Sequence, residues 1–191
     1  PHGHSDMEII TYVRTGAIPH EDSMGNKGRT EGGDVQVMSA AAGVRHAEYN
    51  REDVATTLFQ IWIEPNVHGG EPSWGAAKFP KDARDGRWSV LASGFGDMSD
   101  EDRDALAIRA DARVLGATLG AGDMLTHEVG AGRHAYLVAA TGGIEIAGDT
   151  ASGENSPAAV TADARDGVAL GTGRYTIRAL GDAELVLVDA A

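Results

Sequence analysis

Short apolar segments of strand length, separated by turn-forming residues, constrain this chain more than any other feature. Within the segments, apolar residues alternate with polar ones or follow one another for a few positions, which is typical of β-strands. The connections carry many of the 26 glycines, often in Gly-Asn, Gly-Gly or Asp-Gly pairs that favour tight turns. Residues 100–107 are the best helical candidate, but they have room for little more than a turn. The sequence therefore predicts an all-β protein, with strands at residues 9–14, 35–38, 58–63, 114–119, 135–139, 175–180 and 185–188.

Similar segments recur in the same order along the chain, which indicates two related units in tandem. The similar pairs are residues 12–16 with 138–142, residues 33–38 with 166–170, and residues 58–64 with 185–189. Both members of the last pair are nearly continuous apolar strands that end in an acidic residue. We expect an N-terminal β-barrel over residues 1–80 and a C-terminal one over residues 81–191, with the joint within residues 65–111.

Composition excludes several classes of partner and site. The formal net charge of −13 repels nucleic acid, which is bound through clustered Lys and Arg, so we expect no direct nucleic-acid partner. The chain has no cysteine, which leaves imidazole and carboxylate as metal ligands and fits a reducing cytoplasm. No run approaches the roughly 18 apolar residues that a membrane helix requires, and no signal peptide is visible. We therefore expect a cytoplasmic protein without a membrane partner.

Two pairs of potential ligands stand out at a spacing of two residues. His2 and His4 precede a predicted strand, and His46 and Glu48 lie in another extended segment. Alternate residues of an extended chain point to the same face, so each pair can contact one ion. Two such pairs facing each other would offer three nitrogens and one oxygen, a set that suits Fe, Mn, Co, Ni, Cu or Zn. The remaining histidines lack a companion at this spacing, and we interpret them as surface or structural residues: His20, His68, His127 and His134.

The order of these motifs resembles that of the pirin family, in particular the bacterial pirin-like quercetin 2,3-dioxygenases. The first motif is residues 1–13 (PHGHSDMEIITYV), and the family's next turn is similar to residues 20–26 (HEDSMGN). Residues 33–48, which run from Gly-Asp-Val to His-Ala-Glu, resemble the second motif. Residues 60–63 (QIWI) close the first barrel as in the family. The resemblance is dense over residues 1–64 and loose but collinear after them.

The resemblance implies a bicupin, that is, two tandem cupin barrels of the jelly-roll type, with one metal site in the N-terminal barrel. The family's ligands correspond to His2, His4, His46 and Glu48, with Fe(II) as the expected metal and Mn, Co, Ni, Cu or Zn as alternatives. Glu8 is the competing acidic ligand, because many other cupins take a carboxylate from that position; otherwise it supports the strand. The C-terminal barrel is expected to be degenerate, since the positions that correspond to the ligands hold no pair of histidines: Glu128, Gly130, Arg178 and Leu180.

Two departures from the family pattern affect these expectations. Gly3 replaces the proline that is usual between the two histidines, which loosens the backbone without moving a ligand. Family members also carry further β structure ahead of the first motif, and we expect the first barrel of this chain to lack those N-terminal strands. One wall of the barrel would then be open.

The resemblance implies an enzyme, a metal-dependent dioxygenase that cleaves flavonols such as quercetin with O2. Its substrate would be a small aromatic molecule, and Glu48 would be the catalytic residue, accepting the proton of the flavonol 3-hydroxyl while remaining a weak ligand. The alternative is a non-catalytic regulatory pirin that senses metal or redox state and binds a protein partner. Bleaching of quercetin distinguishes the first hypothesis from metal-dependent capture of a partner.

Overall fold

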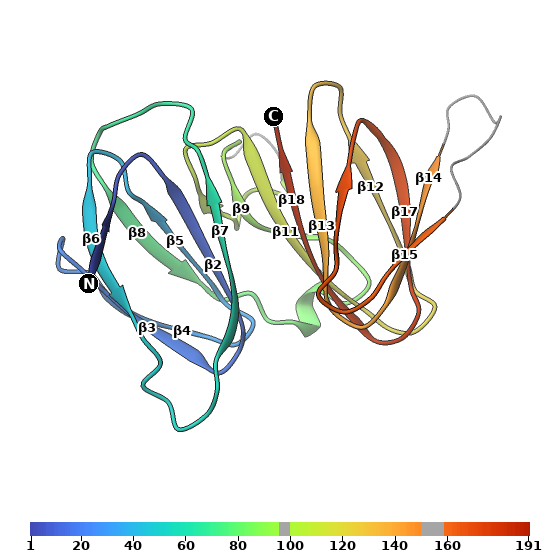
Figure 1. Ribbon diagram of the computed structural model, residues 1–191, viewed down its shortest axis with the longest axis horizontal. Coiled ribbons are helices and arrows are strands. Elements are labelled where there is room, and N and C mark those ends of the chain that lie inside the picture. The colour runs from blue at the N-terminus through green and yellow to red at the C-terminus, as the bar shows by residue number, and fades with distance from the viewer. Residues whose placement is uncertain (96–99, 150–158) are drawn as a thin grey trace. The chain divides into compact units, whose positions relative to one another are not determined.

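The computed structural model is built almost wholly from β-strands and describes residues 1–95, 100–149 and 159–191 (Figure 1). The predicted all-β class is confirmed. The chain divides into two compact units: Pro1–Pro80 with Leu91–Asp111, and Lys81–Val90 with Ala112–Ala191. Residues 91–111 thus group with the N-terminal unit, whereas a single boundary after residue 80 would place them in the second.

The N-terminal unit consists mainly of two four-stranded antiparallel sheets, in the orders β1-β6-β3-β4 and β7-β2-β5-β8. Strand β2 lies in the middle of the second sheet and is buried from Glu8 to Val13, which explains its nearly continuous apolar sequence. The strands are β1 (His2–His4), β2 (Glu8–Thr15), β3 (Ala17–Asp22), β4 (Lys27–Glu31), β5 (Val35–Ser39), β6 (Val44–Glu48), β7 (Thr57–Ile63) and β8 (Ser73–Ala77).

The C-terminal unit repeats this scheme, with strand orders β12-β17-β14-β15 and β11-β18-β13-β16, the second of which is part of a six-stranded sheet. Strand β13 lies between β18 and β16 as β2 lies between β7 and β5. Its strands are β11 (Ala112–Leu119), β12 (Met124–Val129), β13 (His134–Thr141), β14 (Ile144–Asp149), β15 (Val160–Ala162), β16 (Gly167–Leu170), β17 (Gly173–Ala179) and β18 (Ala183–Ala190). The remaining elements are the 3₁₀ turn η1 (Asp82–Arg84) and the parallel pair β9 (Ser89–Ser93) and β10 (Leu106–Ala107).

The duplication extends to irregularities in the strand pairing. The ladder between β2 and β7 shifts register between Val13 and Thr15, and that between β13 and β18 shifts between Ala139 and Thr141. A glycine with positive φ follows each shift, Gly16 at 74° and Gly142 at 72°. The predicted similarity of residues 12–16 and 138–142 therefore reflects a shared bulge and turn, and the fold is the bicupin that the sequence predicts.

One predicted equivalence is displaced by a residue. Val35 pairs with Tyr12, and Gly167 pairs with Val138, so Val35 corresponds to Gly167 and not to Val168. The turn explains the displacement: Arg165 adopts a positive φ of 77° and donates its backbone N–H to β13, as Gly33 does to β2. Arg165 thus occupies the left-handed position that Gly33 holds in the first unit, and the glycine pattern of the sequence does not reveal this equivalence.

The helical candidate at residues 100–107 is wrong. Residues 100–104 form turns, and β10 follows, with Leu106 paired to Ala92 and Ala107 to Ser93. Parallel pairing with β9 satisfies the backbone of β10, so long-range contacts override the local preference of an acidic segment for a helix start.

Candidate metal centre

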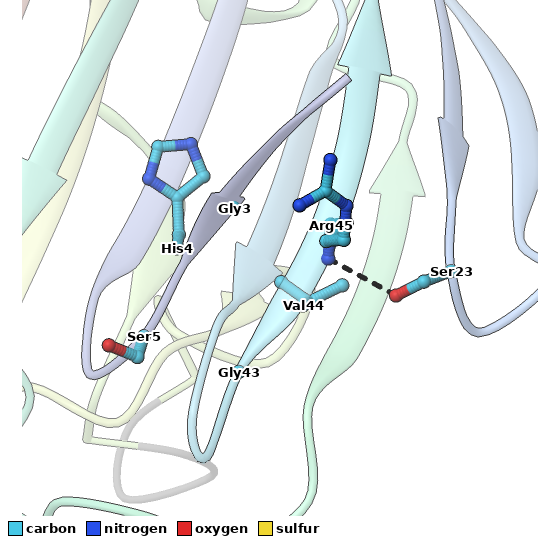
Figure 2. Close-up of a pocket in the computed structure, with 7 residues that line it drawn as sticks. All are labelled: Gly3, His4, Ser5, Ser23, Gly43, Val44 and Arg45. Atoms are coloured by element: carbon cyan, nitrogen blue, oxygen red, sulfur yellow. Dashed lines mark hydrogen bonds between the residues drawn. The ribbon is translucent and has the colours of Figure 1, made fainter.

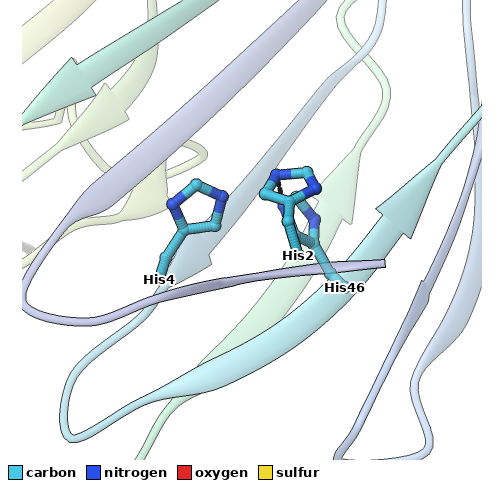
Figure 3. A group of neighbouring side chains, drawn as sticks. All are labelled: His2, His4 and His46. Carbon is cyan, nitrogen blue, oxygen red and sulfur yellow. Dashed lines mark hydrogen bonds between the residues drawn. The ribbon is translucent and has the colours of Figure 1, made fainter.

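Pairing of β1 with β6 brings three histidines together. His2 lies opposite His46 in the antiparallel register, and alternation along β1 places His4 on the same face as His2. The ring centroids are 4.6 Å apart for His2 with His4, 4.6 Å for His2 with His46, and 5.0 Å for His4 with His46. Figure 3 shows the three imidazoles gathered on one side of the two strands.

The ring nitrogens of these histidines fit a metal ion. Nε2 of His2 lies 3.1 Å from Nε2 of His46, and the buried Nε2 of His4 has no hydrogen-bond partner among the described residues. The three side chains form a group whose ligand atoms all lie within 4.8 Å of one another. Burial is the main cause that lowers the pKa of His46 to about 4, and burial followed by the charge of His2 lowers the pKa of His4. Both rings are therefore neutral at neutral pH, the form in which imidazole binds a cation.

Glu48 lies two residues after His46 on β6 and is fixed by two glutamine side chains. Gln60 Nε2 donates a 2.8 Å hydrogen bond to Glu48 Oε2, and Gln36 Nε2 donates to Glu48 Oε1. Only 12% of the Glu48 side chain is exposed. Burial by itself raises the pKa of Glu48, but interactions with His20, the charge of His46 and the amide of Gln60 outweigh it and lower the pKa. The carboxylate is thus ionised and held at the site.

His20 lies within the candidate site, although the sequence pattern had indicated a surface or structural residue at this position. It belongs to a second group of potential ligands with His46 and Glu48. Its side chain is fully buried, Nε2 lies 3.1 Å from Asp22 Oδ2, and Nδ1 lies 3.9 Å from Glu48 Oε1. A signal was present in the sequence, since His20 and Asp22 repeat the spacing of His46 and Glu48 with an acid as the companion.

Glu8, the competing acidic ligand, is engaged elsewhere. It is buried on β2, and its Oε2 accepts hydrogen bonds from Ser39 Oγ at 2.6 Å and from the backbone N–H of Arg109 at 3.1 Å. It belongs to neither group of potential ligands found in the described part of the chain. These contacts favour a supporting role for Glu8 and leave Glu48 as the carboxylate near the histidines.

The other histidines lie apart from these groups. His68 and His134 are exposed, and His127 of β12 is hydrogen-bonded to Asp189 at 3.0 Å. Among described residues of the C-terminal unit, no three potential ligands come together. Of the positions that correspond to ligands, Glu128 pairs across the strands with Arg174, and Arg178 forms an ion pair of 3.0 Å with Glu145.

A shallow pocket of about 390 Å³ lies beside β1 and β6 (Figure 2). Gly3 and Arg45 lie opposite each other in the strand register and alternate with the histidines, so they belong to the outer face of the two strands. The residues that line the pocket are Gly3, His4, Ser5, Ser23, Gly43, Val44 and Arg45. The lining includes His4, so the pocket borders the group of three histidines.

Comparison with known proteins identifies the family. The profile of the family described as Pirin matches residues 1–63, and that of the quercetinase C-terminal cupin domain matches residues 98–190. A pirin-like protein from Caulobacter vibrioides is 58% identical over 192 residues, covering 100% of this chain and 76% of the relative. The chain belongs to the pirin family.

Relatives of this pirin include a quercetin 2,3-dioxygenase from Escherichia coli, 34% identical over 190 residues, which covers 98% of this chain and 74% of the relative. The crystal structure of the bacterial pirin YhhW from Escherichia coli in complex with nickel(II) superposes with a TM-score of 0.81 at 31% identity. That comparison covers 99% of this pirin and 74% of the neighbour. Within the described part of this pirin, no helix has the length and apolar character needed to cross a membrane.

Proposed function

We propose that His2, His4, His46 and Glu48 bind one divalent transition-metal ion, and that the protein uses it to cleave a flavonol such as quercetin with O2. The observation that carries the proposal is the convergence of three imidazoles, with His4 Nε2 unpartnered in the described structure, beside an ionised carboxylate. The names of the relatives, pirin-like protein and quercetin 2,3-dioxygenase, support the same reading.

Fe(II) is the metal that we expect in this site. Three nitrogen ligands and one oxygen ligand match the preferences of first-row divalent ions and leave positions for substrate and O2. When bound, the ion would supply Lewis acidity and a place where a substrate hydroxyl and O2 come together. The nickel(II) in the neighbouring pirin structure is consistent with a site that accepts several such ions.

Glu48 is suited to accept the proton of the flavonol 3-hydroxyl. Each of its oxygens accepts one hydrogen bond from an amide, Oε1 from Gln36 and Oε2 from Gln60, so each retains a lone pair for a cation or a proton. The pKa of Glu48 is lowered, which keeps it ionised before substrate arrives. The two glutamines orient the carboxylate, and the carboxylate moves the proton.

The test is quercetin bleaching in air by protein reconstituted separately with Fe, Mn, Co or Ni. We expect loss of the flavonol absorbance with at least one metal and release of one carbon monoxide for each quercetin. Glu48→Gln should reduce the rate by about 100-fold or more if Glu48 is both base and ligand. Absence of bleaching with every metal, although elemental analysis shows one bound ion per chain, would disprove the proposed activity.

A further inference from the structure

Trp62 is a large exposed aromatic side chain beside the three histidines. It lies on β7 and 53% of it is exposed, although its ring contacts His4 in an edge-to-face arrangement with centroids 5.0 Å apart and planes at 82°. Trp74 of the same unit differs, since it is partly buried and stacked on His20 with centroids 4.9 Å apart. Trp62 thus touches a proposed ligand while keeping much of its surface free.

A hydrogen-bonded chain connects Trp62 to the proposed base. Trp62 Nε1 donates a 3.2 Å hydrogen bond to Gln60 Oε1, and Gln60 Nε2 donates a 2.8 Å hydrogen bond to Glu48 Oε2. Gln60 and Trp62 are two residues apart on β7 and therefore project to the same face. One amide fixes both the indole and the carboxylate, so the ring is oriented relative to the proposed base.

We propose that Trp62 is the specificity-determining wall on which the planar ring system of the substrate stacks, an inference that rests on the proposed flavonol chemistry. The indole offers a flat apolar surface next to His4, where a substrate bound through a hydroxyl near Glu48 has its rings. Offset or edge-to-face contact between aromatic rings is favourable beyond the area that it buries. The wall selects flat aromatic substrates over analogues with the same hydroxyl groups on a puckered ring.

Quercetin and its dihydro analogue taxifolin distinguish this role, because they carry the same hydroxyl groups but taxifolin has a saturated, non-planar central ring. Binding is measured without oxygen, by absorbance and calorimetry, to nickel-loaded protein. We expect Trp62→Leu to weaken quercetin binding about tenfold, which is about 1.4 kcal/mol, and taxifolin binding by less than about threefold. Trp62→Phe, which keeps an aromatic face, should remain within about threefold for both ligands. Tyr136→Leu removes an equally exposed aromatic residue (52%) of the C-terminal unit and is the matched control.

The outcomes separate this inference from the proposed activity. Selective loss of quercetin affinity in Trp62→Leu, at an unchanged metal content, supports the wall even if the wild type bleaches no flavonol in air. If the wild type bleaches quercetin and Trp62→Leu has the same KM for quercetin, the proposed role of Trp62 is disproved and the proposed activity is unaffected. Equal weakening for quercetin and taxifolin, or no quercetin binding to the loaded wild type, also disproves that role.

Discussion

The Nε2 atoms of His2 and His46 lie 3.1 Å apart, although 44 positions separate the two residues along the chain. Two neutral imidazole nitrogens at this distance repel each other through their lone pairs unless a proton or a cation lies between them. A bound cation satisfies both nitrogens and also the unpartnered Nε2 of His4. Metal and protons therefore compete for the same atoms.

The first prediction concerns pH. The pKa of His46 is about 4 in the folded chain, chiefly because of burial, and about 6.5 in the unfolded chain. The unfolded state consequently binds more protons between these values, so the stability of the metal-free protein should fall as pH falls from about 6.5 to 4. Thermal unfolding in the presence of a chelator measures this dependence, and His46→Gln should make it shallower.

Carboxylates contribute to the pH dependence of stability only in a lower pH range. The pKa values of Glu48 and Asp189 are lowered in the folded protein, so their contributions to stability are present above the ordinary carboxyl pKa and are lost only below it. Above about pH 5, the pH dependence of stability therefore arises from histidines, including His4. An identical slope for His46→Gln and the wild type in that window would contradict the prediction.

The second prediction distinguishes Glu48 from Glu8 as the acidic ligand. Glu48→Gln should lose the bound metal on dialysis, because an amide is a weaker ligand than a carboxylate and cannot neutralise the charge of the ion. Glu8→Gln should retain the metal but lower the free energy of unfolding by about 1–3 kcal/mol, since it weakens charge-assisted hydrogen bonds from Ser39 and Arg109. Elemental analysis and urea unfolding of both variants test it. Retention of metal by Glu48→Gln with loss from Glu8→Gln would reverse the assignment.

The third prediction concerns His20, which lies between Asp22 and Glu48. His20→Phe preserves an aromatic ring against Trp74 but removes both polar contacts of the imidazole. Loss of such a supporting group typically costs 10- to 100-fold in metal affinity or activity, and we expect a loss in this range. Competition with a metal-sensitive dye measures the affinity. His68→Phe changes an exposed histidine and should leave it unaltered.

The two-residue repeat of a β-strand predicted those parts of the candidate metal centre that depend on local spacing alone. His2 with His4 and His46 with Glu48 could be grouped because alternate residues of a strand share a face. The positions of Gln36 and Gln60 beside Glu48 depend on how strands distant in sequence come together, which no local pattern reveals. His20 was missed for a different reason, because the residue two positions after it is an aspartate, Asp22, where the recognised pairs carry a histidine or a glutamate.

The fold could be predicted to about the same extent as the candidate metal centre. Short apolar segments and their repetition identify the strands and the duplication, because β2 and β13 occupy equivalent central places in their sheets. The local sequence of residues 100–107 does not contain the information that β9 lies alongside to pair with it. The exposure of Trp62 also could not be predicted, because its β7 position reads as part of an apolar strand.

The last prediction concerns the glycine that follows the bulge of β2. Gly16 has a φ of 74°, and a Cβ there would lie 2.6 Å from Thr56 Oγ1 and 3.0 Å from the backbone oxygen of Ala55. Gly16→Ala therefore combines a left-handed backbone penalty of about 1–2 kcal/mol with overpacking of about 1–3 kcal/mol. Gly25 has a φ of 93° but open space around its Cβ position, so Gly25→Ala should cost only the backbone penalty. Urea unfolding should rank Gly16→Ala as the less stable variant by at least about 1 kcal/mol, and equal stabilities would show that the neighbouring loop yields without cost.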